Sequence, residues 1–435
     1  MRHYKKKVYK IRPYRSYRKK PRKMRVFLIG LLGILVGVVV LGYILPHKGI
    51  VPWKPLFIIE GFKGEVTSDK VKRKQPKGVM PLSGYMTAPE TDYKLHREQV
   101  KVKGIYVSGN RAGSDKFDEL IELCKRTEIN AMVIDIKGDQ GYLTFSVDNN
   151  IIKQAGIIPK SVPIQDINLL IAKLRENNIY PIGRIVTFKD NIIKNTHPEY
   201  MVTKKDGSFY QSNEPGNQKA TWLNPYNKNV WEYILNIAKE AAAVGFEEIQ
   251  FDYIRFHEGM YEGEIDFGYE SASKRKSQII SEFTKYIVEQ LHKEDVYVSA
   301  DVFGAIITSQ FDADTVGQDY IEMSRYLDFI CPMVYPSHYA DGSFGVENPD
   351  LDPYQVLLGS MLASTNKLKE IEETEHRAVV RPWLQDFTAA WMRNHQVYGP
   401  EQIRDQIGGV YDAGLEEWLL WNASNRYTEG GLLEQ

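Results

Sequence analysis

The sequence predicts an α/β protein built as a (β/α)8 TIM barrel that is preceded by an N-terminal transmembrane helix and a linker. Two observations predict the barrel. From about residue 100 onward, short apolar runs alternate with helical patterns, and the apolar runs are continuous rather than strictly alternating. Continuous runs are typical of strands buried on both faces of a parallel sheet. Eight such units over the remaining chain fit a barrel with insertions.

The expected elements follow one another in a regular order. Strands are expected over 102–109, 131–138, 179–188, 248–256, 296–304, 328–337, 378–387 and 416–424. Helices are expected over 115–127, 164–178, 229–244, 273–293, 318–326, 353–373 and 400–413. An open doubly wound sheet is the alternative, but the turn at 108–113 matches the phosphate-binding pattern G-x-G-x-x-G poorly. The barrel is therefore favoured.

The first 45 residues predict a membrane anchor. Residues 26–45 form an uncharged apolar run of 20 residues, which is long enough to span a hydrocarbon core of about 30 Å. Residues 1–25 contain 13 Lys/Arg and no acidic residue, so the positive-inside rule keeps this tip in the cytoplasm and exports the rest. A cleavable signal peptide is the alternative, but no A-x-A-like site follows the run. We expect a single-pass cell-membrane protein with an extracellular C-terminal domain.

The net charge of zero is the sum of two unlike parts. Without the basic tip, 43 Lys/Arg stand against 56 Asp/Glu, so the rest of the chain carries about −13. A basic block beside a membrane span favours binding of 1–25 to anionic lipid over binding to nucleic acid. Residues 46–99 are interpreted as a juxtamembrane stalk, 100–427 as the barrel and 428–435 as a C-terminal tail.

Several kinds of catalytic centre lack their motifs in this sequence. Cys124 and Cys331 fall in a helical and a strand pattern, so two separate buried thiols are expected. No CxxC or HExxH is present, which disfavours a zinc site, and no G-x-S-x-G elbow is present for serine hydrolysis. We expect no metal and no other cofactor.

Two carboxylates are the leading catalytic candidates. In a barrel the active site forms at the C-terminal ends of the strands, where the fourth strand carries Asp252 and the fifth carries Asp301. Neighbouring strands lie about 4.8 Å apart, so these carboxyl groups are expected at roughly 5–10 Å, the range used in glycoside hydrolysis. Structural ion pairs in the barrel mouth are the alternative interpretation.

Other polar and aromatic residues at these strand ends are candidates for binding sugar. They are Asp135, Asp139, Arg184, Trp222, Asn224, Arg255, Tyr335, His338, Trp383, Gln385, Asp386, Trp421 and Asn422. Trp222 and Asn224 belong to the long loop 191–228, which is expected to wall the cleft. Arg381 is also placed at this end, on the seventh strand. A structural role is equally open for Asp135, and the large aromatic residues could instead fill the barrel.

The ordered set of strand-end segments resembles a glycoside hydrolase domain family of bacterial envelope proteins, distantly related to the α-amylase-like clans. The segments include KGIYVSGNRAG (103–113), NAMVIDIKGDQG (130–141), YPIGRIVTFKD (180–190), FEEIQFDYIRF (246–256), VSADVFG (298–304), CPMVYPSHY (331–339), VRPWLQDF (380–387) and WLLWNASN (418–425). The resemblance implies a barrel, a carbohydrate substrate and catalysis by Asp252. Analogy with the amylase-like arrangement places the acid on the fifth strand, where Asp301 stands in place of Glu.

The sequence thus supports a membrane-anchored extracytoplasmic glycoside hydrolase that acts on a cell-envelope or extracellular polysaccharide. A non-catalytic glycan-binding or envelope-scaffold barrel is the first alternative. An envelope esterase or deacetylase is a weaker one, because its metal and serine motifs are absent.

Overall fold

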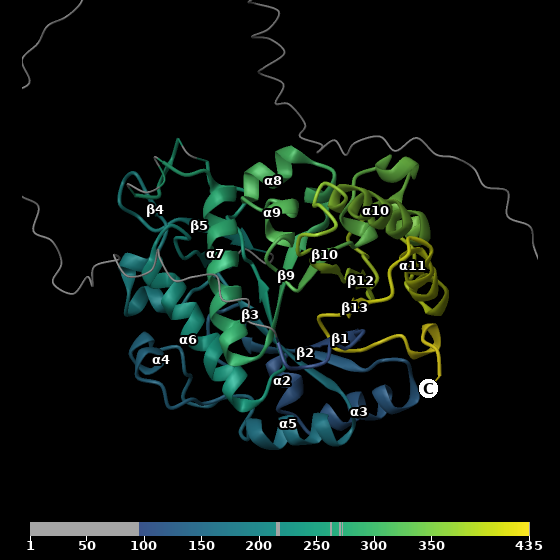
Figure 1. Cartoon of the computed structure of the whole chain (residues 1–435), viewed down its shortest axis with the longest axis horizontal. Coiled ribbons are helices and arrows are strands. Elements are labelled where there is room, and N and C mark those ends of the chain that lie inside the picture. The colour runs from purple at the N-terminus through teal and green to yellow at the C-terminus, as the bar shows by residue number, and fades with distance from the viewer. Residues whose placement is uncertain (1–94, 215–217, 262, 269–270, 272, 435) are drawn as a thin grey trace, which may run out of the picture. The chain divides into compact units, whose positions relative to one another are not determined.

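The parallel strands of the protein close into a barrel, as a computed structural model shows (Figure 1). The structure describes residues 95–434 except 215–217, 262, 269–270 and 272. β1 pairs with β2 on one side and with β13 on the other, and β9 pairs with β10, so the ring has no open edge. The predicted TIM barrel is confirmed. The predicted span at 26–45 lies outside the described residues, and no described helix is long and apolar enough to cross a bilayer.

Eight positions make up the barrel, and the seventh is split into two short strands. The strands are β1 (Lys103–Val107), β2 (Ala131–Lys137), β3 (Tyr180–Val186), β7 (Glu248–Asp252), β9 (Tyr297–Phe303), β10 (Phe329–Met333), β11 (Val379–Val380) with β12 (Trp383–Gln385), and β13 (Trp418–Trp421). Each was expected from its apolar run. The split of the seventh strand was not.

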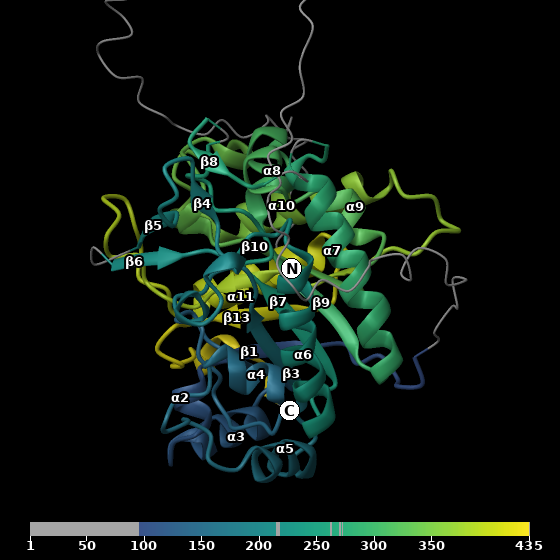
Figure 2. The same ribbon diagram turned by 90° about the vertical axis from the view of Figure 1, so that its left-hand side faces the viewer.

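Helices surround the strands in both views (Figures 1 and 2). They are α2 (Gly109–Ala112), α3 (Phe117–Arg126), α4 (Asn150–Ala155), α5 (Ile167–Glu176), α6 (Lys228–Val244), α7 (Lys276–Leu291), α8 (Gln310–Val316), α9 (Tyr320–Ser324), α10 (Pro353–Leu368) and α11 (Pro400–Asp412). The seven expected helices are present, and α2, α4 and α8 are additional. The helices α2, α3 and α5 lie together at one edge in both views, and α8 and α10 lie at the opposite edge.

The loop 191–228 contains short strands rather than a structureless segment. Within it, β5 (Gln211–Glu214) pairs with β6 (Gln218–Thr221), and β4 (Thr203–Lys204) pairs with β8 (Ile265–Asp266) from the segment that follows β7. The loop then leads into α6, whose N-cap Asn227 accepts a hydrogen bond from the backbone of Asn229. Gly245 ends α6 at a φ of 110°, a left-handed conformation that glycine adopts without a steric cost.

Side chains alternate between two hydrophobic cores. On β2, Met132 and Ile134 pack outward against the helices, whereas Ala131 and Val133 pack inside the barrel. This period of two follows from strand geometry. It aims Asp135 into the barrel at the C-terminal end of the strand. The predicted separate thiols are also confirmed, since Cys124 and Cys331 are both free and buried.

Arg381 lies at the opposite end of the barrel from the one expected. Its guanidinium group donates to both carboxylate oxygens of Glu248, at the start of β7, and to Glu417, which precedes β13. Arg381 and Glu248 have no exposed side-chain surface. The prediction that Arg381 contributes to the C-terminal mouth is therefore wrong, because the break between β11 and β12 leaves this residue facing the N-terminal floor.

We expect Arg381→Gln to lower the free energy of unfolding by about 3–5 kcal/mol, because it leaves two buried carboxylates without their cation. Urea unfolding at neutral pH measures this loss. Arg126→Gln is the matched control, since its ion pair with Glu429 is half-exposed and is worth about 1 kcal/mol or less. An equal decrease in the free energy of unfolding in the two variants would contradict a stabilising role for the cluster of Arg381, Glu248 and Glu417 at the N-terminal end of the barrel.

Candidate active site

A pocket of about 180 Å³ opens at the C-terminal ends of the barrel strands. It is lined by Asp139, Arg184, Asp252, Tyr253, Arg255, Asp301, Phe303, Met333, Tyr335, Trp383 and Trp421. The structure thus brings both predicted catalytic residues into one pocket, together with six of the predicted sugar-binding residues. The catalytic and binding roles themselves remain predictions.

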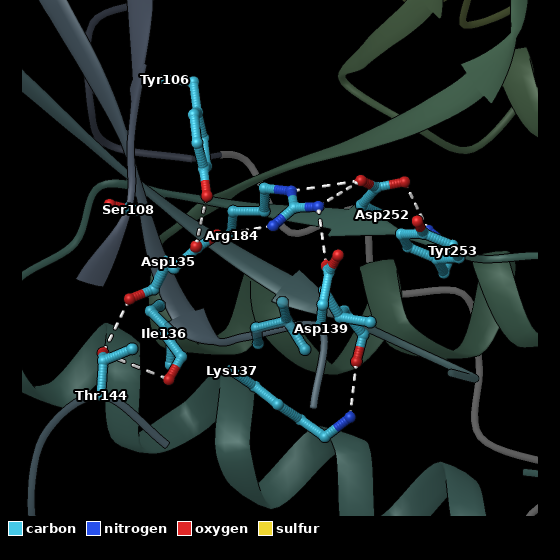
Figure 3. A network of polar contacts seen from close by, with 12 residues as sticks. Tyr106, Ser108, Asp135, Ile136, Lys137, Asp139, Thr144, Arg184, Asp252 and Tyr253 are labelled. Atoms are coloured by element: carbon cyan, nitrogen blue, oxygen red, sulfur yellow. Dashed lines mark hydrogen bonds and ion pairs between the residues drawn. The ribbon is translucent and has the colours of Figure 1, made fainter. Parts of the chain in front are cut away.

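Arg184 joins two carboxylates at the base of the pocket (Figure 3). Its Nη1 donates to Asp135 Oδ1 at 2.6 Å, and its Nη2 donates to Asp252 Oδ2 at 2.6 Å. Tyr106 donates its hydroxyl to the other oxygen of Asp135 at 2.6 Å. The side chains come from β1, β2, β3 and β7, whose inward-facing positions meet inside the barrel. Asp135 thus lies behind Arg184 and holds it toward Asp252.

Aromatic rings fix the guanidinium group of Arg184 from the sides. Its Cζ atom lies 5.5 Å from the ring centroids of both Tyr106 and Trp421, and these two rings stack on one another at 4.2 Å. Burial alone would lower the pKa of Arg184, but the charges of Asp252 and Asp135 outweigh it and raise that pKa well above its usual value. Arg184 is therefore a permanent buried cation.

Asp252 has partners on both carboxylate oxygens. Arg184 donates to Oδ2, and the backbone N–H of Tyr253 donates to Oδ1 at 2.6 Å. Tyr253 has a φ of 52°, a left-handed conformation that is uncommon for a bulky residue and often found at functional sites. This turn at the end of β7 places the ring of Tyr253 in the pocket wall.

Asp301 occupies a different environment from Asp252. It is buried, and Trp383 Nε1 donates to its Oδ1 at 2.6 Å. Burial, followed by the negative charge of Asp252, raises the pKa of Asp301 well above its usual value, and the opposing effects of Arg184 and Trp383 are smaller. The environment of Asp301 therefore favours its protonated form.

The sheet register places the two carboxylates at neighbouring positions. β7 and β9 pair in parallel with Gln250 beside Ser299 and Phe251 beside Ala300. The same register continued by one residue sets Asp252 beside Asp301. Paired positions on adjacent strands are about 4.8 Å apart, so the two side chains rise from the sheet at the same depth and next to each other.

The upper wall of the pocket combines charge with aromatic surface. The guanidinium group of Arg255 lies 4.2 Å from the ring centroid of Phe303 and pairs with Glu258 at 3.1 Å. Asp139 lies 3.6 Å from Arg184 Nη2 and 3.8 Å from Lys189 Nζ, with half of its side-chain surface exposed. This rim can offer both donors and acceptors to a polar ligand. Among the described residues, no cluster of three or more His, Cys, Asp or Glu side chains could hold a metal ion.

Seven predicted sugar-binding residues are not among those that line the pocket. Asp135 is one of them, since it lies behind Arg184, and the others are Trp222, Asn224, His338, Gln385, Asp386 and Asn422. Trp222 is buried and donates to Ser212, so the loop 191–228 contributes this ring to the core rather than to the pocket wall. Asn224 donates to the carbonyl of Phe267 and accepts from the N–H of Tyr226.

The other residues of this group hold loops together. Gln385 is buried and donates to Asp350 while accepting from Ser337. Asp386 accepts two hydrogen bonds from Thr428, and Asn422 donates to the carbonyl of Asp386. His338 is exposed and lies with its ring centroid 5.3 Å from that of Tyr335.

Sequence reasoning missed four residues of the site: Tyr106, Tyr253, Phe303 and Met333. Phe303 stands two positions after Asp301, so strand alternation could have found it. Tyr106 is likewise at an inward position of the first strand, so the same alternation could have found it. No sequence signal marks the left-handed turn at Tyr253, because such turns favour Gly, Asn or Asp.

Comparison with protein families identifies one match. The family described as "Putative glycosyl hydrolase domain" matches residues 104–427, and the predicted family resemblance is confirmed. No curated protein matches the sequence.

Solved structures also match the chain. A hypothetical protein from Ruminiclostridium thermocellum ATCC 27405 is 38% identical over 46% of this chain and 97% of its own, with a TM-score of 0.40. The glycoside hydrolase domain of PgaB (BpsB) from Bordetella bronchiseptica is 14% identical, covers 74% of this chain and 94% of its own, and has a TM-score of 0.51. The likeness to the Bordetella domain supports the barrel fold.

We expect Asp301→Asn to stabilise the protein increasingly above about pH 4. The pKa of Asp301 is raised in the folded state above its unfolded value of about 3.9. Its contribution to stability is therefore complete below the unfolded pKa and is lost as the pH rises toward and through the folded pKa. Asparagine does not titrate, and its amide oxygen can still accept from Trp383. The variant therefore avoids the decrease in the free energy of unfolding that wild type undergoes, which is up to about 1.4 kcal/mol per pH unit.

Urea unfolding of wild type and variant between about pH 4 and about pH 7 measures this difference. Asp115→Asn, at an exposed position, is the control for replacing an acid by its amide. A stability difference between Asp301→Asn and wild type that stays constant over this pH range would contradict a proton held on Asp301.

Proposed function

The chain belongs to the glycosyl hydrolase domain family that matches residues 104–427, and from this premise we propose that it cleaves glycosidic bonds through Asp252 and Asp301. One observation carries the proposal. Two carboxyl groups stand at neighbouring positions of β7 and β9 in one pocket, with unlike partners. Glycosidases use such a pair, in which one carboxyl group is protonated and the other is ionised.

Asp301 acts as the general acid in this proposal. Its raised pKa favours the protonated form, and that proton passes to the oxygen of the leaving sugar. Asp252 is the carboxylate that faces the anomeric carbon, with Arg184 and the N–H of Tyr253 holding its orientation. The positive charge that develops on the sugar is stabilised by this carboxylate.

We further propose direct attack by Asp252. Retaining enzymes have carboxyl groups about 5–5.5 Å apart, whereas inverting enzymes need about 6.5–9.5 Å to fit a water molecule. Asp252 and Asp301 stand at neighbouring positions of adjacent strands, whose backbones are about 4.8 Å apart, and this allows their carboxyl groups to approach to the spacing of the retaining class. In the retaining mechanism Asp252 forms a covalent glycosyl ester, and Asp301 then deprotonates the water that releases the sugar.

The aromatic pocket wall supports a carbohydrate substrate. Trp383 and Trp421 meet edge to face at 5.6 Å, and Tyr335 lies on the same wall. Aromatic rings can pack against the apolar faces of sugar rings, while Arg255 and Asp139 can hydrogen-bond to hydroxyl groups. The substrate is proposed to be a cell-envelope or extracellular polysaccharide, in keeping with the proposed export of the barrel domain.

We expect Asp252→Asn and Asp301→Asn each to lower kcat/KM by at least about a hundredfold, because each removes a proton-transfer or charge-stabilising group. Turnover is measured by release of reducing ends from a panel of polysaccharides. Nuclear magnetic resonance of the first product is expected to show retention of anomeric configuration.

Asp328→Asn is the matched control for the two acid-to-amide changes. Asp328 lies at the start of β10, at the far end of the barrel, and accepts from the backbone of Val298. Its activity is expected to stay close to wild type. Full activity in Asp252→Asn would refute the proposed mechanism. Polysaccharide binding by wild type without any turnover would instead favour a non-catalytic glycan-binding barrel.

We also propose that residues 26–45 anchor the protein in the cell membrane, with the basic tip 1–25 on anionic lipid in the cytoplasm and the barrel outside. The uncharged run of 20 residues behind 13 basic residues supports this orientation.

Membrane topology is testable in a bacterial host. The full chain is expected to remain in the membrane after alkaline carbonate extraction, and a C-terminal epitope should be digested when intact spheroplasts are treated with protease. A variant lacking residues 1–45 should appear in the soluble fraction. Protection of the epitope would contradict the orientation, and a shortened mature chain would indicate a cleaved signal peptide.

A further inference from the structure

A row of aromatic rings leads from the pocket to the protein surface. Tyr335 lines the pocket and is nearly buried. Phe387 follows with its ring centroid 5.8 Å from that of Tyr335, and Trp391 stacks on Phe387 at 5.9 Å with an interplanar angle of 21°. Trp391 is 70% exposed. The row therefore begins in the wall of the candidate active site and ends at the solvent-exposed ring of Trp391.

The loop that carries Trp391 is fastened to the buried residue Asp350. The carboxylate of Asp350 accepts from Gln385 Nε2 at 3.0 Å and from the N–H of Gln396 at 3.2 Å. Its carbonyl accepts from Gln396 Nε2 at 2.7 Å and from the hydroxyl of Tyr398 at 3.3 Å. These bonds flank Trp391 in sequence on both sides. An exposed ring on a loop held in this way is preorganised for binding.

The exposure of Trp391 is unusual in this barrel. Of the tryptophans in the described part of the chain, it alone is classed as exposed, since the others are buried or half-buried. Large aromatic side chains are normally withdrawn from water, because burying one contributes about 1.5–3 kcal/mol. A solvent-exposed tryptophan that stacks on Phe387 with one face can bind a ligand on its other face.

We propose that Trp391 and Phe387 form a distal sugar-binding subsite for a polysaccharide chain whose scissile bond lies beside Asp252 and Asp301. The inference rests on the proposed function and extends it to the form of the substrate. The ring steps of 5.8 Å and 5.9 Å that lead from Tyr335 to Trp391 are together longer than one sugar ring, so a ligand that fills the pocket and reaches Trp391 contains more than one sugar unit. A longer chain gains contacts at both positions.

Binding of a polymer by a variant without turnover tests the subsite directly. We use full-length Asp252→Asn in detergent and the probes amylose, galactomannan, chitosan, hyaluronan and peptidoglycan glycan strands, with affinity electrophoresis and tryptophan fluorescence as readouts. At least one polymer should bind. Adding Trp391→Ala should weaken that binding about tenfold, which is the size of effect typical of an aromatic anchor. Trp391→Ala should weaken the binding of short oligosaccharides of the same polymer by a smaller factor.

Two further variants separate stacking from loss of fold. Trp391→Phe keeps a planar ring and should retain most of the affinity. Leu169→Ala removes a side chain of similar exposure, 64%, from α5 and should change nothing. Thermal unfolding checks that each variant is folded. Unchanged polymer affinity in Trp391→Ala, an equal loss for long and short ligands, or no binding to any probe would overturn the subsite.

The subsite and the proposed activity can fail separately. Polymer binding through Trp391 without any turnover by wild type would refute the hydrolase and leave the subsite in place. Turnover with unchanged polymer affinity in Trp391→Ala would refute the subsite and leave the hydrolase. If Trp391→Ala instead abolished capture of a protein partner while glycan binding stayed unchanged, the exposed ring would belong to a protein interface and the subsite would be overturned.

Discussion

The mouth of the barrel depends on one buried cation, Arg184, held between Asp135 and Asp252. A single guanidinium group lies among three buried carboxyl groups, those of Asp135, Asp252 and Asp301, and one positive charge cannot neutralise three ionised carboxylates. Burial raises the pKa of Asp301, which has no cationic partner of its own at hydrogen-bond distance among the described residues, and this favours its protonated form. The two catalytic candidates therefore differ in their partners, because Arg184 contacts the carboxylate on β7 and Trp383 contacts the carboxyl group on β9.

Each end of the barrel contains a buried arginine between two carboxylates, and the C-terminal end opens into a pocket. At the floor, Arg381 is matched by Glu248 and Glu417, and Arg381 and Glu248 are sealed from solvent. At the mouth, Arg184 is matched by Asp135 and Asp252, but a pocket opens over them and a further carboxyl group joins the cluster. The floor is a completed ion-pair cluster that connects strands. The mouth gathers three carboxyl groups around one guanidinium group, whereas the floor gathers two, and a titratable group without a cationic partner in a pocket is typical of a catalytic centre.

The sequence predicted what depends on strand periodicity and could not predict what depends on contacts between distant loops. Apolar runs located all eight barrel positions, and alternation within them aimed Asp252 and Asp301 at the same end. Gln385 shows the limit, because its hydrogen bonds to Asp350 and Ser337 join residues 35 and 48 positions away. Arg381 shows a second limit, since a break of two residues in the seventh strand moves a side chain from one end of the barrel to the other. The left-handed turn at Tyr253, which directs its N–H to the side chain of Asp252, has no sequence signal, because a tyrosine seldom adopts this conformation.

The charge distribution also constrains how a polysaccharide is held. Residues 26–435 carry a net charge of about −13, so the body of the protein repels an anionic polymer at long range. The cations around the pocket do not reverse this, because Arg184 and Arg255 are each paired with carboxylates. Attraction must then arise at short range, where apolar ring faces are removed from water and no net charge is needed. Rings from Trp421 and Trp383 inside the pocket to Trp391 at the surface offer such contacts. A chain that presents uncharged sugar faces to them is the ligand that this combination of acidic body and aromatic wall accommodates best.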